Sequence, residues 1–341
     1  MVYWMTRLLV WLAGRVPRGP RMWLAGALTE LVYFAWVTKR RVTIANMAQV
    51  LAVAPTDPKA RWAARRTWRN YGRYVADFFY LPNTTPAAVV ARLRDMTPAP
   101  GWRARLEKAR ADGRGVLLAT AHFGNWDAAG VIIGSEFPLH AIAETFADPR
   151  MNELVVAQRA ALGITVIPME RMPRRMLRLL QEGGIVGTPV DRPLPAGEGV
   201  PIVFFGRRCY VPGGIAQLAL RTGSAIVAGF VWCDEVHSPT YYGYMTEPII
   251  PEPSGDRDAD VIALTQRLYD DMADIIRRHP TQWYMFRSFW PAEEAHDATA
   301  SGPQAAAPAR DRLAATAPSE SHVEQAAPAT SEGPTTSVRE G

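Results

Sequence analysis

One histidine and one aspartate stand where a short apolar run gives way to a helical pattern. His122 follows the apolar run GVLLATA at 115–121, and Asp127 comes soon after, beyond Gly124. Reactive groups in open α/β sheets gather at the carboxyl ends of strands. A histidine at such a position is suited to act as a general base near neutral pH. A turn at Gly124 would bring the Asp127 carboxylate to the imidazole Nδ1, where it would fix the tautomer and stabilise the imidazolium.

The same residues also have a purely structural interpretation. A histidine can end a strand and an aspartate can cap a helix, each with local hydrogen-bond partners. The H-x4-D pattern is short and degenerate, so by itself it does not separate the two interpretations. In the catalytic one, Gly124, Asn125 and Trp126 contribute to substrate binding, and backbone amides near this turn stabilise an oxyanion.

A second group of polar residues follows the apolar run at 185–190. Asp191 and Arg192 come directly after it, and Glu198 lies in the glycine-rich loop AGEGV. Arg192 is suited to hold a phosphate of a donor or an acceptor head group by paired hydrogen bonds, although an Asp191–Arg192 pair could also be structural. Glu198 is a candidate for a second orienting carboxylate near His122, the alternative being a solvated side chain.

A proline and two glycines open a later helical pattern. Gly213 and Gly214 follow Pro212 at the expected helix start. Backbone N–H groups at such a start can receive an anion. The P-G-G sequence is also an ordinary turn, so the signal is weak.

Other reaction classes lack the motifs that they need. The chain has no G-x-S-x-G elbow for a serine hydrolase, and no P-loop or G-x-G-x-x-G follows a predicted strand. Its six histidines include no H-x-x-x-H pair, so neither a metal nor another cofactor is expected. Cys209 and Cys233 form no CxxC, which fits a reducing compartment, with a single bridge between them left open.

The elements that must position these residues alternate along the middle of the chain. Short apolar runs bounded by Gly and Pro predict buried strands at 115–121, 139–144, 164–168, 185–190 and 225–232, and an edge strand at 241–247. Helices are predicted at 127–134, 149–162, 172–182, 213–222 and 257–279. This alternation predicts an α/β fold with a mostly parallel central sheet flanked by helices.

Apolar and basic residues are mixed in the N-terminal part of the chain. Residues 1–75 carry thirteen Lys or Arg against two acidic residues, a balance of +11, together with several tryptophans. This combination favours the surface of an anionic membrane, and we found no nucleic-acid motif that would favour the other common partner of basic proteins. The apolar stretch at 22–37 contains Glu30 and is shorter than the roughly 20 residues that a spanning helix needs, so we expect it to lie on the membrane or on the protein.

Composition divides the chain into three predicted parts. The first holds apolar helices at 2–14 and 21–38 and a helix at 57–80 with Asp57 as its N-cap. The last is rich in Ala, Pro, Ser and Thr, and we expect it to be disordered because it has too little apolar surface to bury. The predicted boundaries are 1–80 for the membrane-docking helices, 81–295 for the α/β core and 296–341 for the tail.

Four ordered blocks resemble one known family. The segment AHFGNWD at 121–127 resembles the H-x4-D motif of glycerolipid acyltransferases, and its surroundings are closest to the lipid A lauroyl/myristoyl acyltransferases and the related phosphatidylinositol mannoside acyltransferases. Arg159 looks like the family's arginine ahead of the third strand. The block around Asp191 and the closing segment HPTQWYMFRSFW at 279–290 are also similar. The resemblance covers roughly residues 5–291.

The resemblance implies an enzyme that moves a fatty acyl group from acyl-CoA or acyl carrier protein to a hydroxyl of a glycolipid or phospholipid. His122 and Asp127 would be the catalytic residues, and Arg159, like Arg192, would hold a phosphate or form a structural ion pair. The lipid A enzymes usually carry Asp-Gln where this chain has Asp191-Arg192, which looks more like the mannoside acyltransferases. The acceptor is therefore either lipid A-type or phosphatidylinositol mannoside-type.

We expect direct transfer without an acyl-enzyme, by a monomer at the cytoplasmic face of the cell (inner) membrane that contacts membrane lipids and no nucleic acid. Two alternatives stay open. The same His–Asp pair could activate water in an acyl thioesterase or lipid hydrolase. The chain could also be a lipid-binding protein without catalytic activity.

Overall fold

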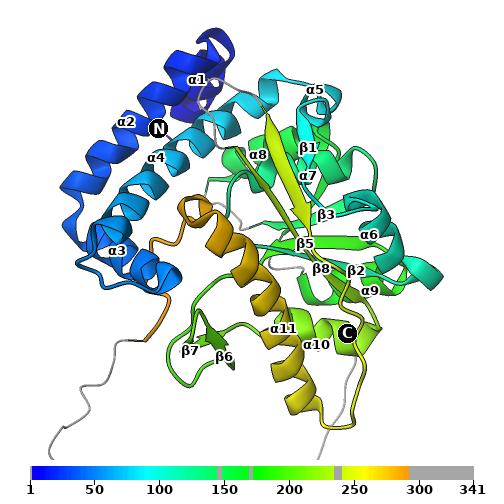
Figure 1. Cartoon of the computed structure of the whole chain (residues 1–341). Helices are drawn as coiled ribbons and strands as arrows, with labels where there is room; N and C mark the ends of the chain where they lie inside the picture. The colour runs from blue at the N-terminus through cyan, green and yellow to red at the C-terminus, as the bar shows by residue number, and fades with distance from the viewer. Residues whose placement is uncertain (1, 144–147, 169–171, 234–239, 292–341) are drawn as a thin grey trace, which may run out of the picture. The chain divides into compact units, whose positions relative to one another are not determined.

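A seven-stranded sheet carries the residues singled out above (Figure 1). The computed structural model describes residues 2–143, 148–168, 172–233 and 240–291. The strands are β1 (Leu93–Asp95), β2 (Val116–Thr120), β3 (Leu139–Ala143), β4 (Ile164–Pro168), β5 (Ile185–Pro189), β8 (Ala225–Trp232) and β9 (Tyr241–Met245). Their order is β1-β9-β8-β2-β5-β3-β4, and the pairs are parallel except β8–β9. The predicted α/β class with a mostly parallel sheet is confirmed.

The buried strands occur where the apolar runs predicted them. One expectation is wrong, because the strand at 241–247 is not at the edge. β9 pairs with β8 on one side and with β1 on the other. The three-residue β1 at the edge is too short to give a recognisable sequence pattern, so its pairing with β9 could not be foreseen.

Helices cover both faces of the sheet. One face packs against α5 (Pro86–Val90), α6 (Trp102–Ala109) and α7 (Trp126–Gly134). The other packs against α9 (Met172–Gln181), α10 (Gly214–Thr222) and α11 (Arg257–Arg278), while α8 (Pro149–Ala161) contacts β4. Alternate residues of the central strands enter the two cores, as Leu117 and Leu118 of β2 do. This two-sided burial explains why β2 and β8 are apolar along most of their length.

Four N-terminal helices gather at one side of the sheet (Figure 1). They are α1 (Val2–Arg15), α2 (Arg18–Ala35), α3 (Val37–Leu51) and α4 (Pro58–Tyr80). The Asp57 side chain caps α4 as predicted, accepting from the Lys59 amide at 2.7 Å. The expected helix at 21–38 ends earlier, at Ala35, and the chain turns at Trp36 into α3, which was not predicted. Neither Gly nor Pro marks that turn, so the sequence carries no breaker there.

Two smaller features complete the described chain. Strands β6 (Val200–Phe204) and β7 (Arg207–Val211) form an antiparallel hairpin that was not predicted. The short helices η1 (Leu81–Asn83), η2 (Ala111–Gly113) and η4 (Pro280–Gln282) lie in connections. Residues Met1–Ala292 form one compact unit. The predicted boundary at residue 80 stays a prediction, and the predicted disordered tail at 296–341 lies outside the described residues.

Candidate active site

His122 lies just beyond β2, and its partner comes from the neighbouring strand. Its Nδ1 is 2.8 Å from Oδ1 of Asp191, and its backbone N–H donates to Oδ2 of Asp191 at 3.0 Å. β2 and β5 are adjacent and parallel, so the residues that follow them meet at the same edge of the sheet. The Asp191 side chain is fully buried, whereas the His122 side chain is 47% exposed. The imidazole therefore has a buried carboxylate behind it and remains accessible to a substrate.

A third residue completes the surroundings of Asp191. The indole Nε1–H of Trp283 donates to Oδ2 of Asp191 at 2.9 Å. Burial of a carboxylate is costly unless hydrogen bonds compensate for its lost hydration. Three N–H groups can provide that compensation, namely the Nδ1–H and backbone N–H of His122 and the indole N–H of Trp283.

Asp127 occupies a different position from the one predicted. Its Oδ2 accepts from the Tyr74 hydroxyl at 2.8 Å, and its Oδ1 accepts from Nη2 of Arg159 at 3.2 Å. The expected contact of Asp127 with the His122 Nδ1 is wrong, because Asp191 takes that place. The first turn of α7 directs Asp127 toward α4 and α8 instead.

The Tyr74 hydroxyl, which donates the hydrogen bond to Asp127, keeps its proton at physiological pH. Burial, together with the adjacent Asp127 carboxylate, raises the pKa of Tyr74 well above its ordinary value. The phenol therefore stays protonated and donates its hydrogen bond at physiological pH. Tyr74 also packs on Trp126 with ring centroids 4.0 Å apart, and Trp126 meets the His122 ring edge-on at 5.4 Å.

Gly124 and Asn125 shape the turn between His122 and α7. Gly124 has a φ of +57°, and a Cβ there would lie 2.1 Å from the Val231 carbonyl oxygen, so no other residue fits without a shift. The Asn125 side chain caps α7 by accepting from the Ala128 amide at 2.9 Å. The structure thus gives these two residues a structural task and does not place them on the cavity that His122 lines.

The backbone amides of this turn are already engaged. Those of Phe123, Gly124 and Asn125 donate to carbonyl groups at 2.7, 2.8 and 2.6 Å respectively. The expectation that amides of this turn receive an oxyanion is therefore not supported for these three. Arg192 lines the same cavity as His122.

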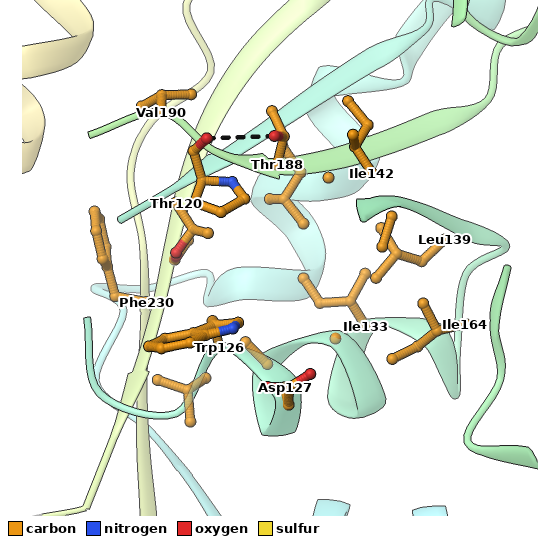
Figure 2. A pocket seen from close by; sticks show the side chains of 18 of the residues that line it. Thr120, Trp126, Asp127, Ile133, Leu139, Ile142, Ile164, Thr188, Val190 and Phe230 are labelled. Atoms are coloured by element: carbon orange, nitrogen blue, oxygen red, sulfur yellow. Dashed lines mark hydrogen bonds between the residues drawn. The ribbon is translucent and has the colours of Figure 1, made fainter. Parts of the chain in front are cut away.

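His122 lines a cavity of about 610 Å³. Its polar lining includes Asp127, Arg159 and Arg192, whereas most of the wall is hydrocarbon from α7 and from the sheet. Figure 2 shows Thr120 and Trp126 toward one end and Leu139 and Ile164 toward the other. Such a lining suits a long apolar chain whose reactive end stays next to the imidazole.

Some of the other predicted site residues line the cavity and others do not. Arg159 and Arg192 line the cavity, and Gly214 does so at the start of α10, with Gly213 as its N-cap residue. Glu198 is exposed in the loop before β6, and the carboxylate on His122 is Asp191. Cys209 and Cys233 form no disulfide with each other, so the bridge left open above is absent from the described part of the chain.

Fold and site together define an α/β enzyme with a histidine–carboxylate pair whose histidine lines an apolar cavity. The chain matches the model of the bacterial lipid A biosynthesis acyltransferase family over residues 1–291, and it belongs to this family. A relative named phosphatidylinositol mannoside acyltransferase, from Mycobacterium tuberculosis, is 31% identical over 254 residues, 73% of this chain and 76% of the relative. The relative of the same name from Mycolicibacterium smegmatis is 30% identical over 253 residues, 73% and 78%.

The predicted family relationship is thus confirmed. The chain is an acyltransferase of lipid or glycolipid biosynthesis. Sequence reasoning missed that Asp191 contacts His122 and that Tyr74 and Trp283 complete the two carboxylate sites. One available signal was the position of Asp191 at a strand end, but its use required knowing that β5 lies beside β2.

Proposed function

We propose that the protein transfers a fatty acyl group from a thioester, acyl-CoA or acyl carrier protein, to a hydroxyl of a membrane glycolipid, with a phosphatidylinositol mannoside-type acceptor favoured over a lipid A-type one. The observation that carries this proposal is the His122–Asp191 pair at an apolar cavity. The names of the relatives favour the mannoside-type acceptor. The Asp191-Arg192 sequence agrees with that choice.

The proposed reaction is a direct transfer. His122 accepts the proton of the acceptor hydroxyl while the oxygen attacks the thioester carbonyl, and Asp191 holds the imidazole and supports the imidazolium. Arg192 stabilises the negative charge on the carbonyl oxygen. The C–S bond then breaks, and the imidazolium returns the proton to the leaving thiolate. Asp127 is a positioning residue in this scheme, because it holds Arg159 beside the cavity.

An acceptor-dependence assay tests this function. The purified full chain is incubated with acyl-CoA or acyl carrier protein thioesters, with and without phosphatidylinositol mannosides or a lipid A precursor, and both free thiol and acylated lipid are measured. A transferase releases thiol only together with acylated lipid. Thiol release of equal rate without any acceptor would indicate a thioesterase, and no release under any condition would indicate a lipid-binding protein.

The wall of the cavity offers a test of the acyl site. Gly187 lies in the cavity lining, where a Cβ would have the flexible Cδ1 of Leu139 as its nearest neighbour at 3.3 Å. A larger side chain there should occupy space that a long acyl chain needs. We expect Gly187→Val to lower kcat/KM for the longest accepted donor by at least about tenfold, with little loss for short ones.

Gly187→Ala serves as the graded control and should show a smaller shift in the same direction. The measurement is kcat/KM for a series of acyl-CoA chain lengths, with thermal melting to check folding. A uniform loss at every chain length would contradict the placement of the acyl chain against Gly187.

The outer surface of α1 and α2 fits a membrane interface. These two helices expose large apolar side chains, among them Trp23 at 62% and Leu31 at 65%, and the remainder are Trp4, Met5, Leu8, Leu9, Trp11, Leu12, Leu24, Leu28, Val32 and Phe34. Arginines lie beside the tryptophans, as Arg15 does 3.9 Å from the Trp11 ring. Within the described residues no helix is long and apolar enough to span a bilayer. We propose that α1 and α2 bind the cytoplasmic face of the membrane peripherally.

Replacing Trp23 and Leu31 together by serine should weaken binding to anionic phospholipid vesicles by at least about tenfold, because burial of one large apolar side chain contributes about 1.5–3 kcal/mol. Vesicle co-sedimentation at fixed ionic strength measures the effect. Ile262→Ser on α11, which removes another exposed apolar side chain, is the matched control. Equal vesicle binding by the double variant and by the control would exclude α1 and α2 as the docking surface.

A further inference from the structure

The segment at 279–290 contacts the His122–Asp191 pair through the indole of Trp283. Trp283 is fully buried, and its Nε1–H donates to the same oxygen of Asp191 that receives the His122 backbone N–H. We propose that Trp283 is a positioning residue for the general base, holding Asp191 so that its other oxygen stays on Nδ1 of His122. This inference rests on the proposed function.

The position of the Trp283 ring is fixed by its neighbours. It contacts four other aromatic rings at centroid distances of 5.4–6.3 Å, those of Phe204, Phe205, Phe289 and Trp290. A ring packed in this way has one orientation for its N–H, and it directs that N–H at Asp191. The aromatic cluster therefore determines where the carboxylate lies.

The same segment also holds the backbone of His122. The Gly124 amide donates to the Gln282 carbonyl at 2.8 Å, and the Tyr284 amide donates to the His122 carbonyl at 2.7 Å. These bonds flank the bridge between Phe123 and Trp283. One three-residue segment, 282–284, thus positions both the backbone of the base and its carboxylate.

The segment is itself anchored to the N-terminal helices. The Asn46 side chain on α3 donates to the carbonyl groups of Met285 and Arg287 at 3.0 and 2.8 Å. Asn70 on α4 donates to the Thr281 carbonyl at 3.1 Å. These hydrogen bonds lie on both sides of Trp283 in the chain. They fix the position of the indole independently of Asp191, so the indole can hold the carboxylate in place.

Removal of the indole N–H has a specific chemical consequence. Oδ2 of the buried Asp191 would keep one donor of its two, so the carboxylate would be less well stabilised and free to rotate. Rotation would take Oδ1 away from Nδ1, so the imidazole would be held less firmly and the imidazolium that forms during transfer would be less well supported. The rate should fall through kcat, since the cavity that binds the acyl chain is unchanged.

Trp283→Phe in the full chain tests the inference, with Trp68→Phe as matched control. The Trp68 indole on α4 is also buried, but its Nε1–H donates to the Thr43 hydroxyl at 3.2 Å, and its ring is not one of those that surround Trp283. We expect Trp283→Phe to lower kcat by roughly 10–100-fold with KM nearly unchanged. Trp68→Phe should leave both as in the wild type. Identical kinetics of the two variants would overturn the inference.

A double-mutant cycle separates a positioning role from a structural one. If Trp283 acts through Asp191, Trp283→Phe should slow an Asp191→Asn protein by less than about threefold. An equal slowing in both backgrounds would show that the indole acts elsewhere. Retained activity of His122→Ala would instead refute the proposed general-base role on which this inference rests, whereas an inactive His122→Ala beside a fully active Trp283→Phe would refute this inference alone.

A measurement that needs no change at Trp283 completes the test. The indole ¹⁵N–¹H resonance of Trp283 should shift when Asp191 is replaced by Asn, because its acceptor loses its charge. The Trp68 resonance should not move, because its N–H donates to the Thr43 hydroxyl. A Trp283 resonance unaffected by Asp191→Asn would contradict the proposed contact even if Trp283→Phe failed to fold.

Discussion

Replacing His122 by alanine is expected to lower kcat/KM by roughly 10²–10⁴-fold, the range that general-base help typically supplies. Among the described residues, the other side chain that hydrogen-bonds Asp191 is Trp283, and its indole N–H cannot take the proton of the attacking hydroxyl. The side chain is 47% exposed and lies outside the packed cores, so stability should change little. Acylated lipid formed per unit time under saturating thioester, together with thermal melting, measures both quantities.

His140→Gln provides the control for this experiment. His140 lies on β3 and does not line the cavity, so its replacement should leave kcat/KM within about twofold. A fully active His122→Ala protein would refute the general-base mechanism. An acyl group trapped covalently on the protein during turnover would refute direct transfer while leaving the location of the site intact.

Asp191→Asn should have the second-largest effect, again roughly 10²–10⁴-fold in kcat/KM. An asparagine can turn its NH₂ group toward Nδ1, which would place the imidazole proton on Nε2 and prevent that nitrogen from accepting the substrate proton. The loss of the negative charge also removes support for the imidazolium. Both effects act on kcat, whereas binding of the acyl donor should be nearly unchanged.

Asp127→Asn is the informative comparison. Its Oδ1 could still accept from Arg159 or from Tyr74, so one of the two present bonds survives and the base is not touched. We expect a loss of about tenfold or less. If instead Asp127→Asn were as damaging as His122→Ala and Asp191→Asn were mild, the H-x4-D interpretation taken from the sequence would be right and the geometric one wrong.

The contrast between Asp127 and Asp191 shows which part of the site could be predicted from the sequence. His122 was identified because a seven-residue apolar run predicts a strand and the residue after a strand lies at the reactive edge of an α/β sheet. Asp127 was assigned to it because a turn at Gly124 could bring the two together and because AHFGNWD resembles the H-x4-D motif of acyltransferases. The contact that forms instead joins residues 69 positions apart. No local sequence pattern predicts a contact between residues so far apart in the chain.

The strand order explains why. Asp191 and His122 meet only because β5 lies next to β2, although β3 and β4 intervene in the chain. Trp283 is further removed still, 92 positions from Asp191, and it arrives through a segment anchored on α3, a helix that was not predicted. Each of these contacts depends on the packing of elements distant in sequence, to which hydrophobic periodicity is insensitive.

The sequence by itself determined the α/β class, the position of the buried strands, the cap of α4 and the location of His122 at a strand end, because these depend on local periodicity and turn chemistry. Only the tertiary structure decided which carboxylate contacts the imidazole, which amides of the HFGNW turn are engaged, and that His122 lines an apolar cavity. Those features follow from the order of strands in the sheet and from side-chain packing between its two faces and their helices, which no single segment specifies.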